Sequence, residues 1–155
     1  MLSGGSMQQT KKNQGFTLIE LMVTIAIMAI IAMMAVPSFI NIINKSQIND
    51  DARDFADHIV VIRSDALLKQ KEQSLSLNGA DAWIPKDKVE WDTNQPVVTT
   101  ITYNMMGSLK SDNNLCFILR HKKDSNLKAV IITRKNGMVI YDKSLNACPN
   151  DLGNE

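Results

Sequence analysis

The longest apolar segment of the chain lies near its N-terminus. The 24 positions from Leu21 to Asn44 contain no charged residue, and a straight α-helix of this length would extend about 36 Å. That is enough to cross the hydrocarbon core of a bilayer. Because Lys11 and Lys12 precede the segment, the positive-inside rule places the N-terminus in the cytoplasm. The pattern predicts one membrane-spanning helix and an exported C-terminal domain.

An amphipathic pattern follows directly. Apolar residues recur at spacings of 4, 3, 4, 3 and 4, which predicts a continuing helix with one stripe buried against a sheet. Lys69 and Lys71 near its end suit the negative pole of the helix dipole. The stripe consists of Ile48, Ala52, Phe55, Ile59, Ile62 and Ala66, and the aspartates expected on other faces are Asp50, Asp51, Asp54, Asp57 and Asp65.

Beyond about Gln73 the pattern becomes strand-like. β-branched and alternating segments separated by turn residues predict short strands. Asn136-Gly137 favours a type I′ hairpin turn, which would place Thr133 opposite Ile140 and Ile132 opposite Tyr141. A long N-terminal helix followed by an antiparallel β-sheet is an α+β architecture. The predicted strands are at residues 75–77, 97–103, 115–120, 129–133 and 138–141, with a turn at Asn78-Gly79.

Glu20 distinguishes the apolar segment from simpler membrane segments. A secretory signal peptide has a shorter apolar region and ends at a small-residue cleavage site, which this segment lacks. Hydropathy alone leaves an uncleaved signal anchor open. A lone carboxylate in a membrane helix costs up to roughly 3 kcal/mol, so such a residue is usually functional and has a partner. If the chain were cut after Gly15, the new α-amino group of Phe16 would lie one helical turn from Glu20 and could pair with it.

The six residues from Gly15 to Glu20, Gly-Phe-Thr-Leu-Ile-Glu, resemble the processing site of type IV pilins and type II secretion pseudopilins. The resemblance implies that a prepilin peptidase cuts between Gly15 and Phe16 and N-methylates Phe16. It also implies that Glu20 guides assembly by meeting the N-terminal amine of an adjacent subunit. Pro37 matches the helix-disrupting proline of pilin stalks, where a kink or a locally melted segment is expected.

A weaker resemblance extends further along the chain. Arg63-Ser64-Asp65-Ala66 late in the helix, the short strands and the glycine turn near the C-terminus resemble the GspH/FimT/FimU-type minor pilins and related pseudopilins. The implied fold is the pilin fold. The implied organisation is a leader peptide at residues 1–15, a transmembrane and filament-core helix at 16–44, and a periplasmic or extracellular globular domain at 45–155. Met7 as the start codon would give a leader of more usual length than Met1.

The resemblance implies a minor pilin that copolymerises into a type IV pilus, in an initiating or tip complex. Its expected partners are other minor pilins, the major pilin, the prepilin peptidase and methylase, and the inner-membrane assembly platform. The subunit is expected in the inner membrane before assembly, with its N-terminus cytoplasmic, and afterwards in the pilus at the cell surface. A type II secretion pseudopilin of the GspH class is the alternative.

Two cysteines, Cys116 and Cys148, lie in the exported part of the chain. An even pair in that compartment predicts a disulfide, whereas two free buried thiols remain the alternative. A zinc site is disfavoured, because His58 and His121 lack the close Cys/His spacing of structural zinc sites.

Catalysis has little support in the sequence. Neither His58 nor His121 is paired with an evident nucleophile and oriented acid, so both are interpreted as structural or solvated. Trp83 and Trp91 are interpreted as packing residues, with a ligand platform as the alternative. We expect no enzymatic activity, no cofactor and no metal.

Nucleic-acid binding is a second hypothesis. Six cations occur within 16 residues, opposed only by Asp124, and such clusters neutralise phosphates. In DNA-binding FimT-like pilins, arginines follow the glycine of the C-terminal turn, but here Met138, Val139 and Ile140 follow Gly137. DNA uptake is therefore placed second to pilus assembly. The cations are Arg120, Lys122, Lys123, Lys128, Arg134 and Lys135.

Overall fold

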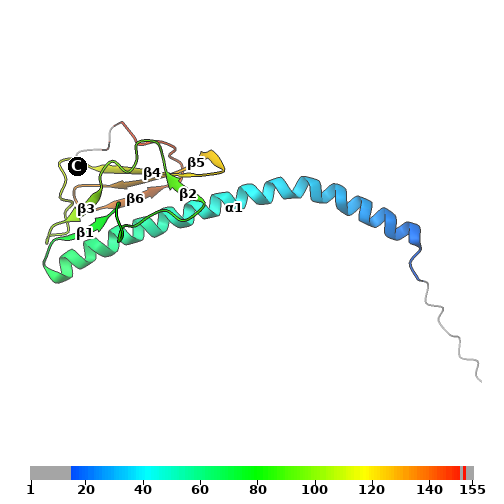
Figure 1. The fold of residues 1–155 in the computed structure, drawn as a ribbon, viewed down its shortest axis with the longest axis horizontal. Coiled ribbons are helices and arrows are strands. Elements are labelled where there is room, and N and C mark those ends of the chain that lie inside the picture. The colour runs from blue at the N-terminus through cyan, green and yellow to red at the C-terminus, as the bar shows by residue number, and fades with distance from the viewer. Residues whose placement is uncertain (1–14, 151, 153–155) are drawn as a thin grey trace, which may run out of the picture. The chain divides into compact units, whose positions relative to one another are not determined.

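The computed structural model describes residues 15–150 and 152. Within these residues it contains one long helix followed by short strands, and all the strand pairs are antiparallel (Figure 1). The predicted α+β class is confirmed. The elements are α1 (Leu18–Lys69), β1 (Gln73–Ser76), β2 (Val89–Trp91), β3 (Thr100–Tyr103), β4 (Leu115–His121), β5 (Asp124–Thr133) and β6 (Val139–Asp142).

The chain divides into two compact units, residues 1–39 and 40–155. Of the first unit, the structure describes residues 15–39. Most of the expected leader, including Lys11, Lys12 and the start at Met1 or Met7, lies outside the described residues. The predicted boundary at residue 44 falls within α1. This helix is unbroken through Pro37, so no locally melted segment is present there, and a kink stays a prediction.

The strands of the second unit form two sheets. A four-stranded sheet has the order β2-β4-β5-β6, and β1 pairs with β3 in a two-stranded sheet. β2 was not predicted from the sequence; its three residues have a β-branched, an acidic and an aromatic side chain. Its pairing with the edge of β4 supplies the backbone hydrogen bonds that so short a segment cannot make alone.

The second half of α1 packs on the four-stranded sheet through the predicted stripe (Figure 1). Phe55 is fully buried and lies at the centre of an aromatic cluster, with its ring centroid 5.2 Å from that of Phe117 on β4 and 4.5 Å from that of Trp83. Ala52 and Ala66 have no exposed surface, and such small side chains let the helix approach the strands closely. Ile62 is half-buried against the same cluster.

One prediction for this helix is wrong. Asp51 was expected on a face other than the buried stripe, but its side chain is only 3% exposed. Its Oδ2 accepts the backbone N–H of Lys86 at 2.8 Å, and the Lys86 Nζ lies 3.5 Å from its Oδ1. A buried carboxylate is tolerated when it is hydrogen-bonded and charge-paired. Asp51 therefore anchors the segment before β2 to the helix.

The opposite face of the sheet carries a second, smaller apolar cluster. It is built on Cys116, Val130 and Ile132, against which Ile118, Ile140 and the C-terminal segment pack. A disulfide joins Cys116 on β4 to Cys148 in that segment, as predicted. Residues 129–133 are therefore buried on both faces of the sheet, one covered by α1 and the other by the C-terminal segment.

The β5–β6 hairpin has a different register from the predicted one. Thr133 pairs with Val139, and Ile132 pairs with Ile140. The Gly137 N–H donates to the Arg134 carbonyl at 2.8 Å, and the Arg134 N–H donates to the Met138 carbonyl at 2.8 Å. The loop thus has three residues and ends in a glycine with φ 84°, whereas a type I′ turn needs positive φ at both central positions. The extra loop residue shifts the register by one.

Arg63 of α1 joins two glycine turns to the helix. Its Nε donates to the Gly107 carbonyl at 2.9 Å and its Nη2 donates to the Asn136 carbonyl at 3.3 Å. A Cβ at Gly137 would collide with the Gly107 carbonyl oxygen and with the Arg63 guanidinium. The resemblance singled out Arg63 and the glycine turn separately, and the structure brings them together.

Breaking the disulfide should destabilise the globular unit. The bond closes a loop with a sequence separation of 32, so Cys116→Ser with Cys148→Ser should lower the free energy of unfolding by about 2 to 5 kcal/mol. The measurement is the thermal melt of the full chain in detergent, followed by near-UV circular dichroism of the buried tryptophans. Equal melts for the variant and the oxidised wild type would contradict this prediction.

Gly137→Ala should lower the free energy of unfolding by about 2 to 4 kcal/mol, because it adds steric collision with Arg63 and Gly107 to the strain of a positive φ. Gly79→Ala is the matched control. Gly79 also has a positive φ, of 110°, but nothing lies within 4 Å of the position that its Cβ would take, so only backbone strain applies. Equal losses in chemical denaturation would show that the collisions with Arg63 and Gly107 contribute nothing.

Candidate functional site

The described chain begins with the segment that was predicted to be processed. Gly15, Phe16 and Thr17 precede α1, which starts at Leu18. The bond between Gly15 and Phe16 therefore lies outside the helix, where no helical hydrogen bond protects it. This position is compatible with cleavage by a peptidase, which needs an extended substrate backbone.

Thr17 and Glu20 form the helix start. The Thr17 Oγ1 accepts the backbone N–H of Glu20 at 3.3 Å, and the Thr17 carbonyl accepts the N–H of Leu21 at 3.2 Å. Thr17 is thus the N-cap residue, and Thr-x-x-Glu is the sequence of a capping box. The N-cap role of Thr17 was not predicted, although the Thr-x-x-Glu spacing is visible in the sequence. Glu20 lies in the first turn, where its negative charge stabilises the positive pole of the helix dipole. This role is additional to its predicted role in assembly.

The capped start corrects one geometric expectation. Phe16 was placed on the same helical face as Glu20, one turn before it, but in the described chain Phe16 precedes the cap. Helical periodicity therefore does not relate the two residues. Pairing of Glu20 with a terminal amine stays a prediction. The helical register does not support such a pair within one chain.

The helical surface of the first unit is apolar and uncovered. Nearly every side chain from Leu18 to Phe39 is exposed, and α1 is long and apolar enough to cross a membrane by length and composition. A helix that is apolar on all sides is stable only in lipid or among other apolar helices.

The six cations proposed for DNA do not form one patch. Lys122 and Lys123 lie in the β4–β5 turn, whereas Arg134 and Lys135 lie in the β5–β6 turn. The ten residues of β5 separate the two turns, which is about 30 Å at roughly 3.3 Å per residue. Closeness in sequence therefore does not produce closeness in space here.

The other two cations are committed to ion pairs within the sheet. Arg120 lies opposite Glu90 on β2, and its Nε is 2.8 Å from the Glu90 Oε1. Lys128 lies beside Arg120 on β5, and its Nζ is 2.7 Å from the Asp92 Oδ2. Burial alone would raise the Asp92 pKa, but the Lys128 hydrogen bond, the Thr93 amide and the two cations together hold the pKa below its ordinary value.

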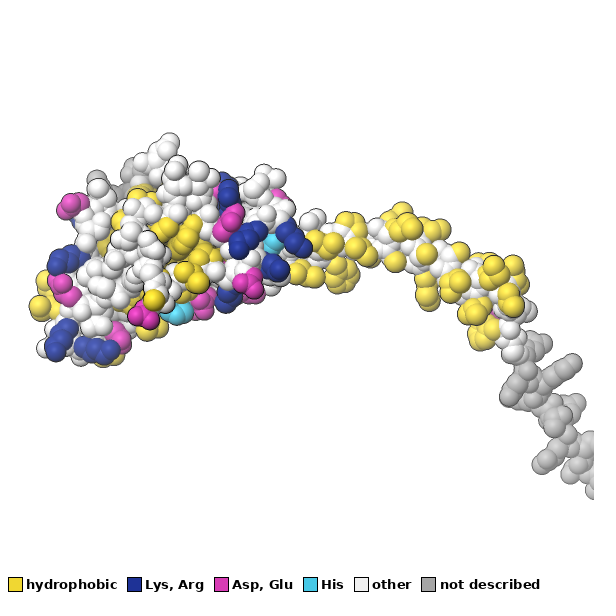
Figure 2. Space-filling model, in the orientation of Figure 1, with side chains coloured by type: hydrophobic (Ala, Val, Ile, Leu, Met, Phe, Trp, Pro, Cys, Tyr) yellow, Lys and Arg dark blue, Asp and Glu magenta, His cyan; other side chains and the backbone are white. Residues whose placement is uncertain are grey.

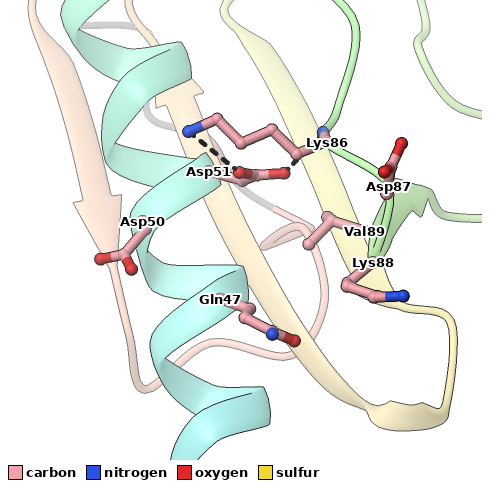
Figure 3. Close-up of a pocket in the computed structure, with 7 residues that line it drawn as sticks. All are labelled: Gln47, Asp50, Asp51, Lys86, Asp87, Lys88 and Val89. Carbon is pink, nitrogen blue, oxygen red and sulfur yellow. Dashed lines mark hydrogen bonds and ion pairs between the residues drawn. The ribbon is translucent and has the colours of Figure 1, made fainter.

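A hollow of about 560 Å³ lies between α1 and the segment before β2 (Figure 3). Its charged groups include Asp50, Asp87 and the Asp51–Lys86 pair drawn with dashed lines. The Asp51 carboxylate in this hollow is occupied by Lys86, which gives it a structural role. Among the described residues, no group of three or more His, Cys, Asp or Glu side chains could hold a metal ion.

The histidines and tryptophans have structural partners. His121 is 1% exposed, and its Nδ1 accepts the Lys123 N–H at 3.2 Å, so its Nε2 carries the proton and donates to the Gln47 Oε1 at 3.0 Å. His58 is exposed beside Asp54. The Trp83 Nε1 donates to the Asp54 Oδ2 at 2.8 Å, and its ring packs against Trp91. The interpretation of the tryptophans as packing residues fits these contacts.

Comparisons with known proteins agree with this geometry. The family model described as the prokaryotic N-terminal methylation motif matches residues 10–36. Two crystal structures of the Pseudomonas aeruginosa type IV minor pilin FimU are similar in fold. One has a TM-score of 0.53 at 12% identity, covering 68% of this chain and 94% of FimU. The other has a TM-score of 0.50 at 13% identity, covering 66% and 97%. Sequence comparison with curated proteins found no match.

The N-terminal motif and the fold together define a type IV pilin-like protein with the fold of a minor pilin. The predicted pilin fold is confirmed. At 12% to 13% identity, the similarity to FimU concerns the fold.

The Asp92 carboxylate should make stability depend on acid pH. Because its pKa is lower in the folded state than in the unfolded state, its contribution is present above the unfolded pKa of about 3.9 and is lost as pH falls through the folded value. Asp92→Asn should thus be less stable than wild type at pH 6. The stability difference, measured by urea unfolding, should shrink below about pH 4. A difference that does not vary with pH would contradict this prediction.

Proposed function

We propose that this chain is a minor pilin subunit that copolymerises into a type IV pilus, in a small complex that initiates the filament or lies at its tip. The observation that carries the proposal is the methylation motif at residues 10–36, which includes the start of a helix whose exposed surface is apolar as far as Phe39. Such a helix can exchange lipid contacts for contacts with other pilin helices without exposing apolar surface to water.

The proposal assigns the N-terminal residues their roles. A prepilin peptidase cuts after Gly15 and methylates Phe16, residues 16–44 anchor the subunit in the inner membrane, and residues 45–155 form the exported domain. Glu20 then meets the amine of a neighbouring subunit. An intermolecular partner suits the structure better than an intramolecular one, because the capped helix start does not place Phe16 and Glu20 on one helical face. Other minor pilins, the major pilin and the assembly platform are the proposed partners.

Two alternatives share the same N-terminus. A type II secretion pseudopilin of the GspH class would use the same helix in a different machine. DNA uptake would require a continuous cationic surface, and the exposed Lys122 and Lys123 favour it, but two of the six candidate cations are neutralised by Glu90 and Asp92. Pilus assembly therefore remains the first proposal.

Two substitutions at Glu20 separate its roles. Glu20→Gln retains the hydrogen-bonding group that a capping box uses at this position but removes the charge, whereas Glu20→Ala removes both. If the charge guides assembly, incorporation into purified filaments should fall at least about tenfold in both variants, while membrane insertion stays normal. Incorporation is measured by quantitative immunoblotting of sheared pili.

The outcome that would contradict charge-guided assembly is normal incorporation of Glu20→Gln with loss in Glu20→Ala, since it would assign Glu20 to helix capping alone. Intact-mass measurement of the same filaments provides the control for processing. The mature chain should begin at methylated Phe16. If the wild-type chain were recovered only with secretion pseudopilins, it would be assigned to the secretion machine.

A further inference from the structure

Five lysines surround α1 at the point where its uncharged segment ends. Lys88 and Lys123 line one hollow, of about 210 Å³, together with Ile40, Ile43 and Asn44. Lys45 and Lys143 line another hollow at the same level of the helix. Lys122 lies beside Lys88, because its backbone N–H donates to the Lys88 carbonyl at 2.9 Å. These residues, Lys45, Lys88, Lys122, Lys123 and Lys143, are named the lysine collar.

The ammonium groups of the lysine collar are available for a ligand. All five side chains are exposed, and none forms an ion pair with a residue that the structure describes. Lys128, which also lines the second hollow, is by contrast neutralised by Asp92. Figure 2 shows several dark blue side chains at this end of the globular unit, with magenta acidic side chains beside them. A surface of this charge attracts phosphate groups.

Apolar side chains accompany these lysines. Ile40 is 50% exposed and Ile43 is 51% exposed, and both share a hollow with Lys88 and Lys123. A surface that combines isoleucine side chains with ammonium groups matches the boundary between acyl chains and headgroups, where lysine stems lie on apolar material and their charges reach phosphate. A nucleic-acid backbone offers no apolar phase for these isoleucines.

The order of charges along the helix fits the same boundary. The uncharged segment ends at Asn44, and Lys45 follows it immediately. Two exposed carboxylates, Asp50 and Asp87, line the adjoining hollow together with Lys88 of the collar. Asp50 lies six residues beyond Asn44, about 9 Å further along the helix at roughly 1.5 Å per residue. Along α1 beyond Asn44 a cation, Lys45, thus comes before the first acid, Asp50.

We propose that the lysine collar binds the phosphate groups of anionic phospholipids at the outer face of the membrane that anchors the subunit. The inference rests on the membrane-anchored state in the proposed function. The contacts would hold the globular unit against the headgroups until the subunit leaves the bilayer. Each lysine near an anionic surface contributes roughly a fivefold gain in affinity, which salt screens.

The test uses the full chain in lipid nanodiscs made of phosphatidylcholine alone or of phosphatidylcholine mixed with phosphatidylglycerol. The measurement is the acetylation rate of each lysine, determined by mass spectrometry. Collar lysines should react roughly fivefold more slowly in the anionic discs, and high salt should remove this protection. The exposed Lys71 and Lys135, outside the collar, should react equally in both lipids.

Matched double variants test whether the lysines act together. Lys88→Gln with Lys123→Gln should reduce the protection of Lys45, Lys122 and Lys143, whereas Lys71→Gln with Lys135→Gln should leave it unchanged. Equal rates in the two lipids would overturn the inference. Protection by a DNA oligonucleotide in phosphatidylcholine discs, with no protection by phosphatidylglycerol, would overturn it in favour of nucleic acid.

An alkaline carbonate wash of membranes from expressing cells distinguishes loss of the membrane anchor from loss of the lipid contact alone. Loss of the chain into the wash would overturn the membrane-anchored state and the lysine collar with it. Retention of the chain together with equal acetylation rates would overturn only the lipid contact and leave the proposed pilin function intact.

Discussion

The contact between the second half of α1 and the four-stranded sheet is the interaction on which the globular unit depends. Phe55 inserts between Phe117 and the two tryptophans, and the alanines of the stripe bring the helix close enough for this insertion. Because one sheet face is filled by α1, the other needs a separate cover, which the disulfide-linked C-terminal segment provides. The sheet is thus stabilised on each face by a segment from outside it, α1 on one face and the C-terminal segment on the other.

Elements with a strong period could be predicted from the sequence, and those fixed by distant partners could not. The stripe from Ile48 to Ala66 was correct because helical spacing and burial agree at five of its six positions, and the sixth, Ile62, is half-buried. The burial of Asp51 was missed because its partner, the backbone of Lys86, is 35 residues away. The hairpin register was wrong because Asn136-Gly137 is compatible with both a two-residue and a three-residue loop, and the Arg63 contact with the turn is not visible in the local sequence.

The same distinction applies to the candidate site. The motif from Gly15 to Glu20 is local, so its assignment required no tertiary information. The basic run from Arg120 to Lys135 is local in sequence only, because β5 places its two ends at opposite ends of the sheet. The lysine collar is the reverse case, since residues distant in sequence come together in the fold: Lys45 and Lys143 line one hollow beside α1, and Lys88 and Lys123 line another. The density of charges along the sequence therefore predicted a patch from Arg120 to Lys135 that the fold divides, and gave no sign of the lysine collar.

Under the proposed function, charges at the two ends of the apolar segment act in opposite directions when the subunit leaves the membrane. Glu20 costs up to roughly 3 kcal/mol in lipid, less near the interface, so moving it to the amine of a neighbouring subunit favours departure. Collar contacts with lipid phosphate, at roughly 1 kcal/mol for each lysine, would oppose departure. Because the five collar lysines together contribute about 5 kcal/mol, more than Glu20 costs in lipid, the subunit would be held at the membrane surface until contacts with a neighbouring subunit are added. Retention and release would then be controlled by the same helix, through a carboxylate at its start and the lysines around Asn44.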